Sequence, residues 1–177
     1  MSTKNFVLLP DFLTPKTPSM KKILSLLVAL LFLASCGSGK VREARKTFKG
    51  DWLLTSITYP GSTGNFNVQL FDDTSAACLE SSQWNFISNN NTGSYVPVKS
   101  QCSSNTRFFI WSINEVDKET GNYDFMLKPT NEEHESTRGN EGYRIDLVTL
   151  TGDQMVWEHT VRFEGEPFTI RMNFTKE

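Results

Sequence analysis

The chain has 177 residues, and its 18 basic and 20 acidic side chains give a net charge of −2 at neutral pH. Residues 1–35 hold four lysines and one aspartate, so the remaining 142 residues carry 14 basic and 19 acidic side chains, a net charge of −5. An acidic chain without a basic stripe argues against nucleic acid as a partner, and against lipid-headgroup binding through charge.

A basic and then apolar segment near the N-terminus ends in a cysteine. Lys21 and Lys22 precede the apolar run 23–33, and the sequence Leu-Ala-Ser-Cys ends at Cys36. A membrane-spanning helix needs about 20 apolar residues, whereas a shorter run behind a basic start is typical of a secretory signal. Leu-Ala-Ser-Cys resembles the lipobox of bacterial lipoproteins, which implies cleavage before Cys36 and lipidation of its thiol. Two acyl chains give a stable membrane anchor.

We therefore predict a signal peptide over residues 1–35, with an uncleaved anchor helix as the alternative. Residues 1–19 contain three prolines and precede a second methionine, Met20. We interpret them as the result of a misassigned start codon, with an extended signal as the alternative. Gly37 and Ser38 stand where some Gram-negative lipoproteins carry an aspartate that retains them in the inner membrane. By that analogy, we expect a lipid-anchored protein of the outer membrane that faces the periplasm.

Residues 36–46 are small and basic and show no periodicity, so they are predicted to be a lipidated tether. Residues 47–177 have the length of one domain with a single core. Here alternating apolar and polar runs, bounded by Gly, Pro, Asn or Asp, are typical of half-buried strands. About nine such runs are predicted, at 50–58, 66–70, 84–87, 94–99, 107–114, 123–128, 143–150, 154–163 and 167–174.

No convincing helix follows the signal, and residues 76–82 form either an irregular segment or one short helical turn. Regularly spaced, alternating strands favour an antiparallel sandwich or a closed barrel, an all-β fold in either case. Alternation also predicts the apolar side chains that point inward. On the later strands these are Tyr123, Phe125, Leu127, Tyr143, Ile145, Leu147, Met155, Trp157, His159, Val161, Phe163, Phe168, Ile170, Met172 and Phe174.

Two cysteines remain once Cys36 carries lipid. An even number of cysteines in an exported chain is interpreted as a disulfide, here between Cys78 and Cys102. The alternative is two free, buried thiols.

The start of the first predicted strand carries a further motif. Gly50-Asp51-Trp52 resembles the Gly-x-Trp signature of lipocalins, and the lipobox and the cysteine pair widen the resemblance to bacterial lipocalin-like lipoproteins. It implies an antiparallel up-and-down barrel of about eight to nine strands over residues 47–177, with Trp52 plugging its floor. It also implies a late arginine packed over that tryptophan. Arg171 is the candidate, although its strand alternation points it outward, and generic core packing of Trp52 is the alternative.

No pattern in the chain indicates an enzyme, a cofactor or a metal site. No Gly-x-Ser-x-Gly elbow or phosphate-binding glycine loop is present. The acidic residues around His134, in the polar stretch 131–142, lack the alternating ligands and glycine turn of a calcium loop and are interpreted as a solvated loop. His159 is the one histidine on an apolar face, where it either contacts a ligand or is a core histidine bonded to backbone.

A barrel of about eight strands is filled by side chains or holds one small ligand. We expect a small hydrophobic or amphipathic ligand, with membrane contact through the acyl chains on Cys36. A deep cavity and a packed barrel with a shallow mouth pocket are both open alternatives. The predicted pocket residues are Phe109, Trp111, Phe125, Tyr143, Trp157 and His159. The rival hypothesis is a non-enzymatic interaction module that docks another envelope protein through its loops or an exposed strand.

Overall fold

The computed structural model describes residues 36–115 and 123–177, so the predicted signal peptide lies outside the described residues. From Gly37 onward these residues belong to one compact unit. In the described part of the chain, no helix is both long enough and apolar enough to cross a membrane.

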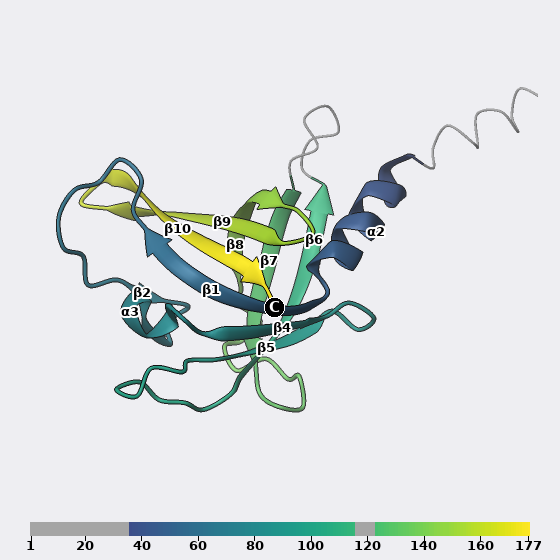
Figure 1. Ribbon diagram of the computed structural model, residues 1–177, viewed down its shortest axis with the longest axis horizontal. Coiled ribbons are helices and arrows are strands. Elements are labelled where there is room, and N and C mark those ends of the chain that lie inside the picture. Colours follow the sequence, from purple (N-terminus) through teal and green to yellow (C-terminus); the bar gives the residue numbers. More distant parts are fainter. Residues whose placement is uncertain (1–35, 116–122) are drawn as a thin grey trace, which may run out of the picture. The chain divides into compact units, whose positions relative to one another are not determined.

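Eight antiparallel strands form a closed barrel in the order β1-β10-β9-β8-β7-β6-β5-β4 (Figure 1). Consecutive strands from β4 to β10 are neighbours, and β1 closes the barrel by pairing with both β4 and β10. This confirms the all-β, up-and-down closed barrel. The strands are β1 (Gly50–Thr58), β4 (Gln83–Ile87), β5 (Thr92–Val96), β6 (Arg107–Glu115), β7 (Tyr123–Thr130), β8 (Tyr143–Leu150), β9 (Gln154–Phe163) and β10 (Glu166–Lys176).

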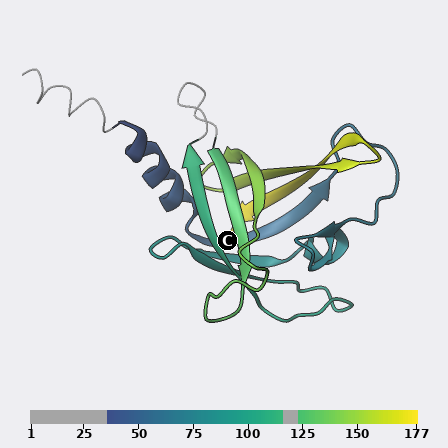
Figure 2. The ribbon, with the colours of Figure 1, turned by 180° about the vertical axis from the view of Figure 1, so that it is seen from behind.

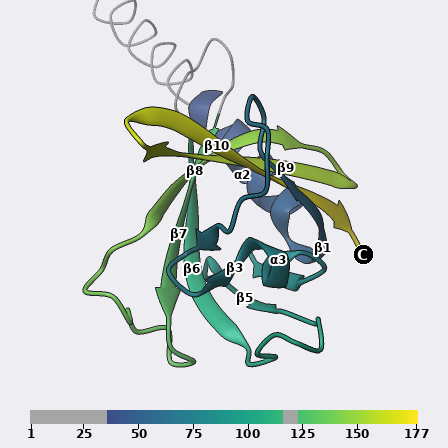
Figure 3. The same cartoon turned by 90° about the vertical axis from the view of Figure 1, so that its left-hand side faces the viewer.

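The strand predicted at 66–70 is not part of the barrel. Only Gln69–Leu70 (β2) is extended and paired, and its partner is Thr74–Ser75 (β3) in a separate two-stranded sheet. The connection from β1 runs beside the β9–β10 hairpin to β2, β3 and the short helix α3, Ala76–Leu79 (Figures 1 and 3). Its apolar residues alternate because one side of the connection packs on the core, which gives the same pattern as a barrel strand.

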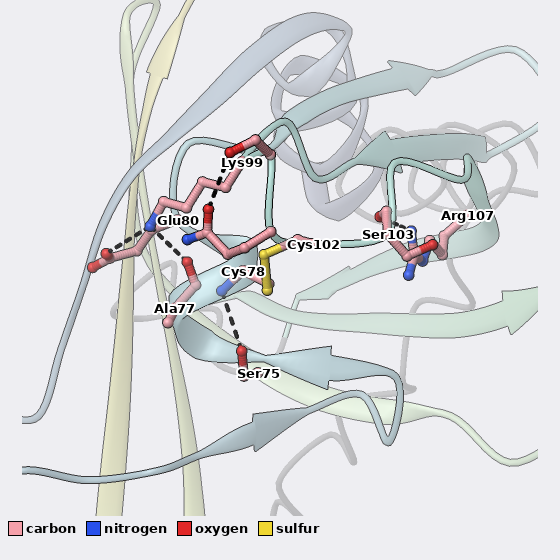
Figure 4. The surroundings of a disulfide bond; sticks show 10 residues. Ser75, Ala77, Cys78, Glu80, Lys99, Cys102, Ser103 and Arg107 are labelled. Carbon is pink, nitrogen blue, oxygen red and sulfur yellow. Dashed lines mark hydrogen bonds and ion pairs between the residues drawn. A yellow bond between two sulfur atoms is a disulfide. The ribbon is translucent and has the colours of Figure 1, made fainter.

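The disulfide Cys78–Cys102 is confirmed and fastens α3 to the loop after β5 (Figure 4). The two Cα atoms lie 5.7 Å apart, within the usual range for a disulfide. Ser75 caps α3, because its side-chain oxygen accepts a hydrogen bond from the Cys78 amide at 3.3 Å. Lys99 adds a second link by donating to the carbonyl of Ala77 at 2.6 Å.

The prediction that no helix follows the signal is wrong, because residues Cys36–Phe48, which include the predicted tether, form a helix, α2, that leads directly into β1 (Figure 2). Ala44 and Phe48 are buried one turn apart, and Phe48 has no exposed surface. The apolar residues Val41, Ala44 and Phe48 are spaced three and four residues apart, but this spacing covers only two turns and is too short to identify a helix from sequence alone. Its last turn is held by tertiary packing, since the ring of Phe48 enters the barrel.

Large aromatic rings fill the barrel around Phe48. Its ring stacks on Trp111 and Phe125 at centroid distances of 5.2 and 5.0 Å, and meets Phe86 edge-on at 4.6 Å. Trp84 and Trp157 are also fully buried. This part of the interior is therefore a packed core. Phe163, at the tip of the β9–β10 hairpin, keeps the predicted inward phase, and its ring centroid lies 5.9 Å from that of the buried Phe168, but its position at the tip leaves it 55% exposed.

Candidate functional site

A cluster of side chains surrounds Trp52 at the start of β1, and we call this cluster the barrel floor. The Trp52 side chain is fully buried, and its indole nitrogen donates a hydrogen bond of 2.9 Å to the carbonyl of Phe48. The ammonium of Lys176 lies 5.0 Å from the Trp52 ring centroid and donates to the carbonyl of Thr47 at 2.9 Å. Gly50 has a φ of +111°, which L side chains rarely adopt. The glycine, the tryptophan and a cation thus form one unit at the start of β1.

That cation is Lys176, so the assignment of Arg171 to the floor is wrong. On β10, Lys176 pairs with Trp52, whereas Arg171 pairs with Thr58 at the other end of β1. Arg171 also has the outward phase of its strand, between the buried Ile170 and Met172. Its guanidinium Nε donates to a carboxylate oxygen of Glu158 at 2.8 Å, in an ion pair on the outside of the sheet.

The main cavity lies at the end of β9 and β10 that is remote from Lys176. It has a volume of about 460 Å³ and is bounded by these two strands, the start of β8 and residues 65–72. We call residues 65–73 the mouth segment. The volume falls within the range of about 300–1,000 Å³ that is usual for small-molecule sites. The apolar wall includes Phe66, Val68, Leu70, Val161, Phe168 and Ile170.

Two of the six predicted pocket residues, Tyr143 and His159, line this cavity. The other four, Phe109, Trp111, Phe125 and Trp157, do not line it, since they are at most 3% exposed and pack in the filled part of the barrel. All six share the inward phase of their strands. Their position along the barrel separates the two groups, and strand alternation carries no information about that position.

Tyr143, His159 and Asp72 form the polar wall of the cavity. The Tyr143 hydroxyl donates to a carboxylate oxygen of Asp72 at 2.8 Å, and Arg138 approaches the same oxygen at 2.8 Å. The ring of His159 stands edge-on to that of Tyr143, and its Nδ1 lies 3.0 Å from the carbonyl oxygen of Arg144. Partial burial, with the hydrogen bond and charge of Asp72, raises the pKa of Tyr143 to about 12, so its hydroxyl stays protonated at neutral pH.

The mouth segment is held in place by two consecutive aspartates. Phe71 and Asp72 have positive φ values of 56° and 48°, a left-handed conformation that is costly for residues with a Cβ. Asp73 follows and accepts hydrogen bonds of 2.9 Å from both the Tyr95 hydroxyl and the Arg107 guanidinium. Burial and the neighbouring Asp73 raise the pKa of Tyr95 well above its ordinary value. These bonds turn the chain so that Phe71 packs edge-on against Tyr143.

The sequence analysis did not assign Asp72 and Asp73 to this site. The feature that could have indicated them is an acidic pair immediately after an apolar, alternating run. Their partners Tyr95, Arg107, Arg138 and Tyr143 are remote in sequence, so the pairing emerges only in the folded chain.

The arrangement is suited to non-covalent binding. Among the described residues, no three histidine, cysteine or carboxylate side chains gather in a way that could hold a metal ion. Most of the cavity lining is apolar, and polar atoms lie along one wall. This arrangement is typical of pockets that bind an amphipathic molecule, with the polar wall contacting its polar end. A scan against protein-family models finds no match to this chain, and a search of curated proteins finds none either.

Proposed function

We propose that this chain is a lipid-anchored, lipocalin-like protein of the cell envelope that binds a small hydrophobic or amphipathic molecule without acting as an enzyme. The observation that carries the proposal is the cavity of about 460 Å³ between the mouth segment and β8–β10. Its apolar wall can exclude water from a ligand body, and the area so buried stabilises a complex by about 25 cal/mol per Å². Its polar wall can orient the polar end of the ligand.

The proposed address rests on the N-terminal region. The basic start, the apolar run and Leu-Ala-Ser-Cys support cleavage before Cys36 and its lipidation. Anchoring places the cavity at a membrane, where apolar molecules concentrate. We propose the periplasmic face of the outer membrane as the location, with no nucleic-acid partner.

The binding test uses the Cys36→Ser chain, its organic extract and an apolar fluorescent probe. We expect an extracted ligand, or saturable probe binding. Val161 lines the cavity, so Val161→Trp should fill it and abolish binding. Val156 lies on the same strand with the opposite phase, so Val156→Trp is the matched control and should still bind. The proposal would be contradicted if the organic extract contained no ligand and the probe did not bind.

The anchoring test is independent of the ligand. Cells supplied with labelled palmitate should incorporate label into the wild-type chain and none into Cys36→Ser. Cys36→Ser should also be absent from the outer-membrane fraction, in which the wild-type chain is expected. Equal labelling of the two chains, or no label in either, would contradict lipidation at Cys36.

The second candidate function is an interaction module that docks another envelope protein. Two observations favour it: rings pack the interior around Phe48, and Phe163, which also borders the cavity, is 55% exposed at the hairpin tip. Within the described residues each barrel strand pairs with two others, so docking would use loops. Crosslinking in membranes should then capture one stoichiometric partner that Phe163→Ser loses. Capture unaffected by that substitution would argue against the hairpin tip as the docking surface.

A further inference from the structure

We infer that the cavity takes an uncharged amphiphile whose polar end donates a hydrogen bond, such as a long-chain alcohol, and discriminates against fatty-acid anions. The inference rests on the proposed function and adds the chemical class of the ligand. It follows from the donors and acceptors of the polar wall.

His159 presents an acceptor to the cavity. Its Nδ1 lies 3.0 Å from the Arg144 carbonyl oxygen, which can only accept, so the proton of the neutral ring is on Nδ1. The other ring nitrogen, Nε2, is then unprotonated and accepts. Among the described residues, no hydrogen bond to Nε2 is found, and the side chain lines the cavity. A ligand hydroxyl can therefore donate to it.

Tyr143 and Asp72 reinforce this polarity. The Tyr143 hydroxyl donates its proton in a hydrogen bond of 2.8 Å to Asp72. Toward the cavity, the phenol oxygen can therefore act only as a hydrogen-bond acceptor. The Asp72 carboxylate is also an acceptor. All three groups of the polar wall thus offer acceptors, and a complementary ligand must bring the donor.

Among the described lining residues, a carboxylate ligand would meet no side chain with a permanent positive charge. None of the described lining residues is lysine or arginine. The cation near the wall, Arg138, is already paired with Asp72 at 2.8 Å. A fatty-acid anion would lose water, face acceptor atoms and lie near the Asp72 carboxylate. Removing an ion from water without a partner is strongly unfavourable.

The remaining polar residues do not reverse this preference. Asn65, Asn67 and Gln69 border the cavity with exposed side chains on the mouth segment. An amide can donate or accept, so it serves an alcohol as well as an acid. Discrimination by charge is therefore determined at the Tyr143–His159–Asp72 wall.

The experiment measures displacement of an apolar fluorescent probe from the Cys36→Ser chain by dodecanol, dodecanoate and dodecyltrimethylammonium. It is run at about pH 8, where the acid is ionised. We expect dodecanol to bind about tenfold or more tightly than either ion. Dodecanoate brings an unpaired negative charge, and dodecyltrimethylammonium has no N–H or O–H to donate to the acceptors, while Asp72 is already paired with Arg138.

Variants then test the role of the polar wall. His159→Leu should remove most of the preference for dodecanol over dodecanoate, while His159→Gln, which keeps an acceptor, should retain part of it. The matched control is His134→Gln, at the other histidine, which is exposed in the loop after β7 and should leave the preference unchanged.

The outcomes separate the inference from the function on which it rests. If the probe binds but dodecanoate or the ammonium competes as well as dodecanol, the inference is overturned and the binding function stands. An unchanged preference in His159→Leu also overturns the assigned role of His159. If neither the probe nor any amphiphile binds, the proposed function fails and the inference fails with it.

Discussion

At the residue scale, the stability of the barrel floor depends on the side chains around the Trp52 indole. Lys176 contacts it from the end of β10, with its ammonium 5.0 Å from the ring centroid and hydrogen-bonded to Thr47. This lysine therefore combines a cation–π contact with a charged hydrogen bond. Arg171, in contrast, pairs with Glu158 on the outside of the sheet, where it is 42% exposed.

We predict that Lys176→Met lowers the free energy of unfolding by about 1–3 kcal/mol, because both contacts are lost. Arg171→Met is the matched comparison on the same strand and should cost about 0–1 kcal/mol, as expected for an exposed ion pair. Denaturant unfolding of both variants checks the difference. Equal losses would show that the lysine has no special role at the floor.

The tyrosines of the mouth region predict how stability depends on alkaline pH. The pKa of Tyr143 is raised to about 12 in the fold, against about 10 in an unfolded chain. Its contribution is therefore full below about pH 10 and is lost as the pH rises toward 12. Tyr143→Phe should lose less stability than the wild type across this window, measured by urea unfolding at a series of pH values.

Tyr95 contributes to the same alkaline loss, since its pKa is raised by burial and by Asp73. It is present in both the wild type and Tyr143→Phe, so the difference between the two curves isolates Tyr143. Parallel curves between about pH 10 and 12 would contradict a raised pKa at Tyr143.

At the element scale, the ring of Phe48 is the main contact between α2 and the interior of the barrel. Phe48 contacts Phe86, Trp111, Phe125 and Trp157 inside the barrel, and its backbone oxygen accepts the Trp52 indole proton. The helix therefore closes the floor before β1 begins.

We predict that Phe48→Ala destabilises the whole domain by about 3–5 kcal/mol, the usual cost of deleting a buried ring. Lys46 is in the same turn and exposed, so Lys46→Ala should change stability by no more than about 0.5 kcal/mol. Thermal unfolding of the two variants is the measurement. A small effect of Phe48→Ala would show that α2 contributes little to the stability of the domain, as expected for the predicted tether at 36–46.

At the scale of the whole domain, the interior is divided between a packed core and a cavity. The core extends from Trp52 through Phe48 to Trp157, while the cavity lies under the mouth segment. The rings stabilise the fold, and the cavity remains for a ligand. Because the two regions share β9 and β10, ligand binding should be linked to global stability.

We predict that a cavity-binding amphiphile at about one hundred times its dissociation constant raises the free energy of unfolding by about 2.7 kcal/mol. Val161→Trp should abolish this stabilisation, and Val156→Trp should keep it. Unfolding curves recorded over a range of ligand concentrations provide the test. Stabilisation that persists in Val161→Trp would place the binding site elsewhere.

The structure places two of the six predicted pocket residues at the cavity and four in the packed core, and this difference has a physical reason. Alternation correctly placed Tyr143 and His159 on the inner face, and both line the cavity. Alternation could not distinguish these cavity residues from the core residues Phe125 and Trp157. The position of a side chain along the barrel axis depends on strand stagger and on the other side chains in the interior. Asp72 escaped prediction because its partners Arg138 and Tyr143 are distant in the chain.

The sequence by itself determined the features that local physics controls: the strands of the barrel, the turns between them and the Gly-x-Trp start of β1. The even cysteine count of an exported chain also indicated the pair Cys78–Cys102. Only the tertiary structure decided that Lys176 covers Trp52, that residues 36–48 form a helix, and that residues 66–70 lie in the mouth segment. These depend on strand register and on packing between residues far apart in the chain, and neither is encoded in a local pattern.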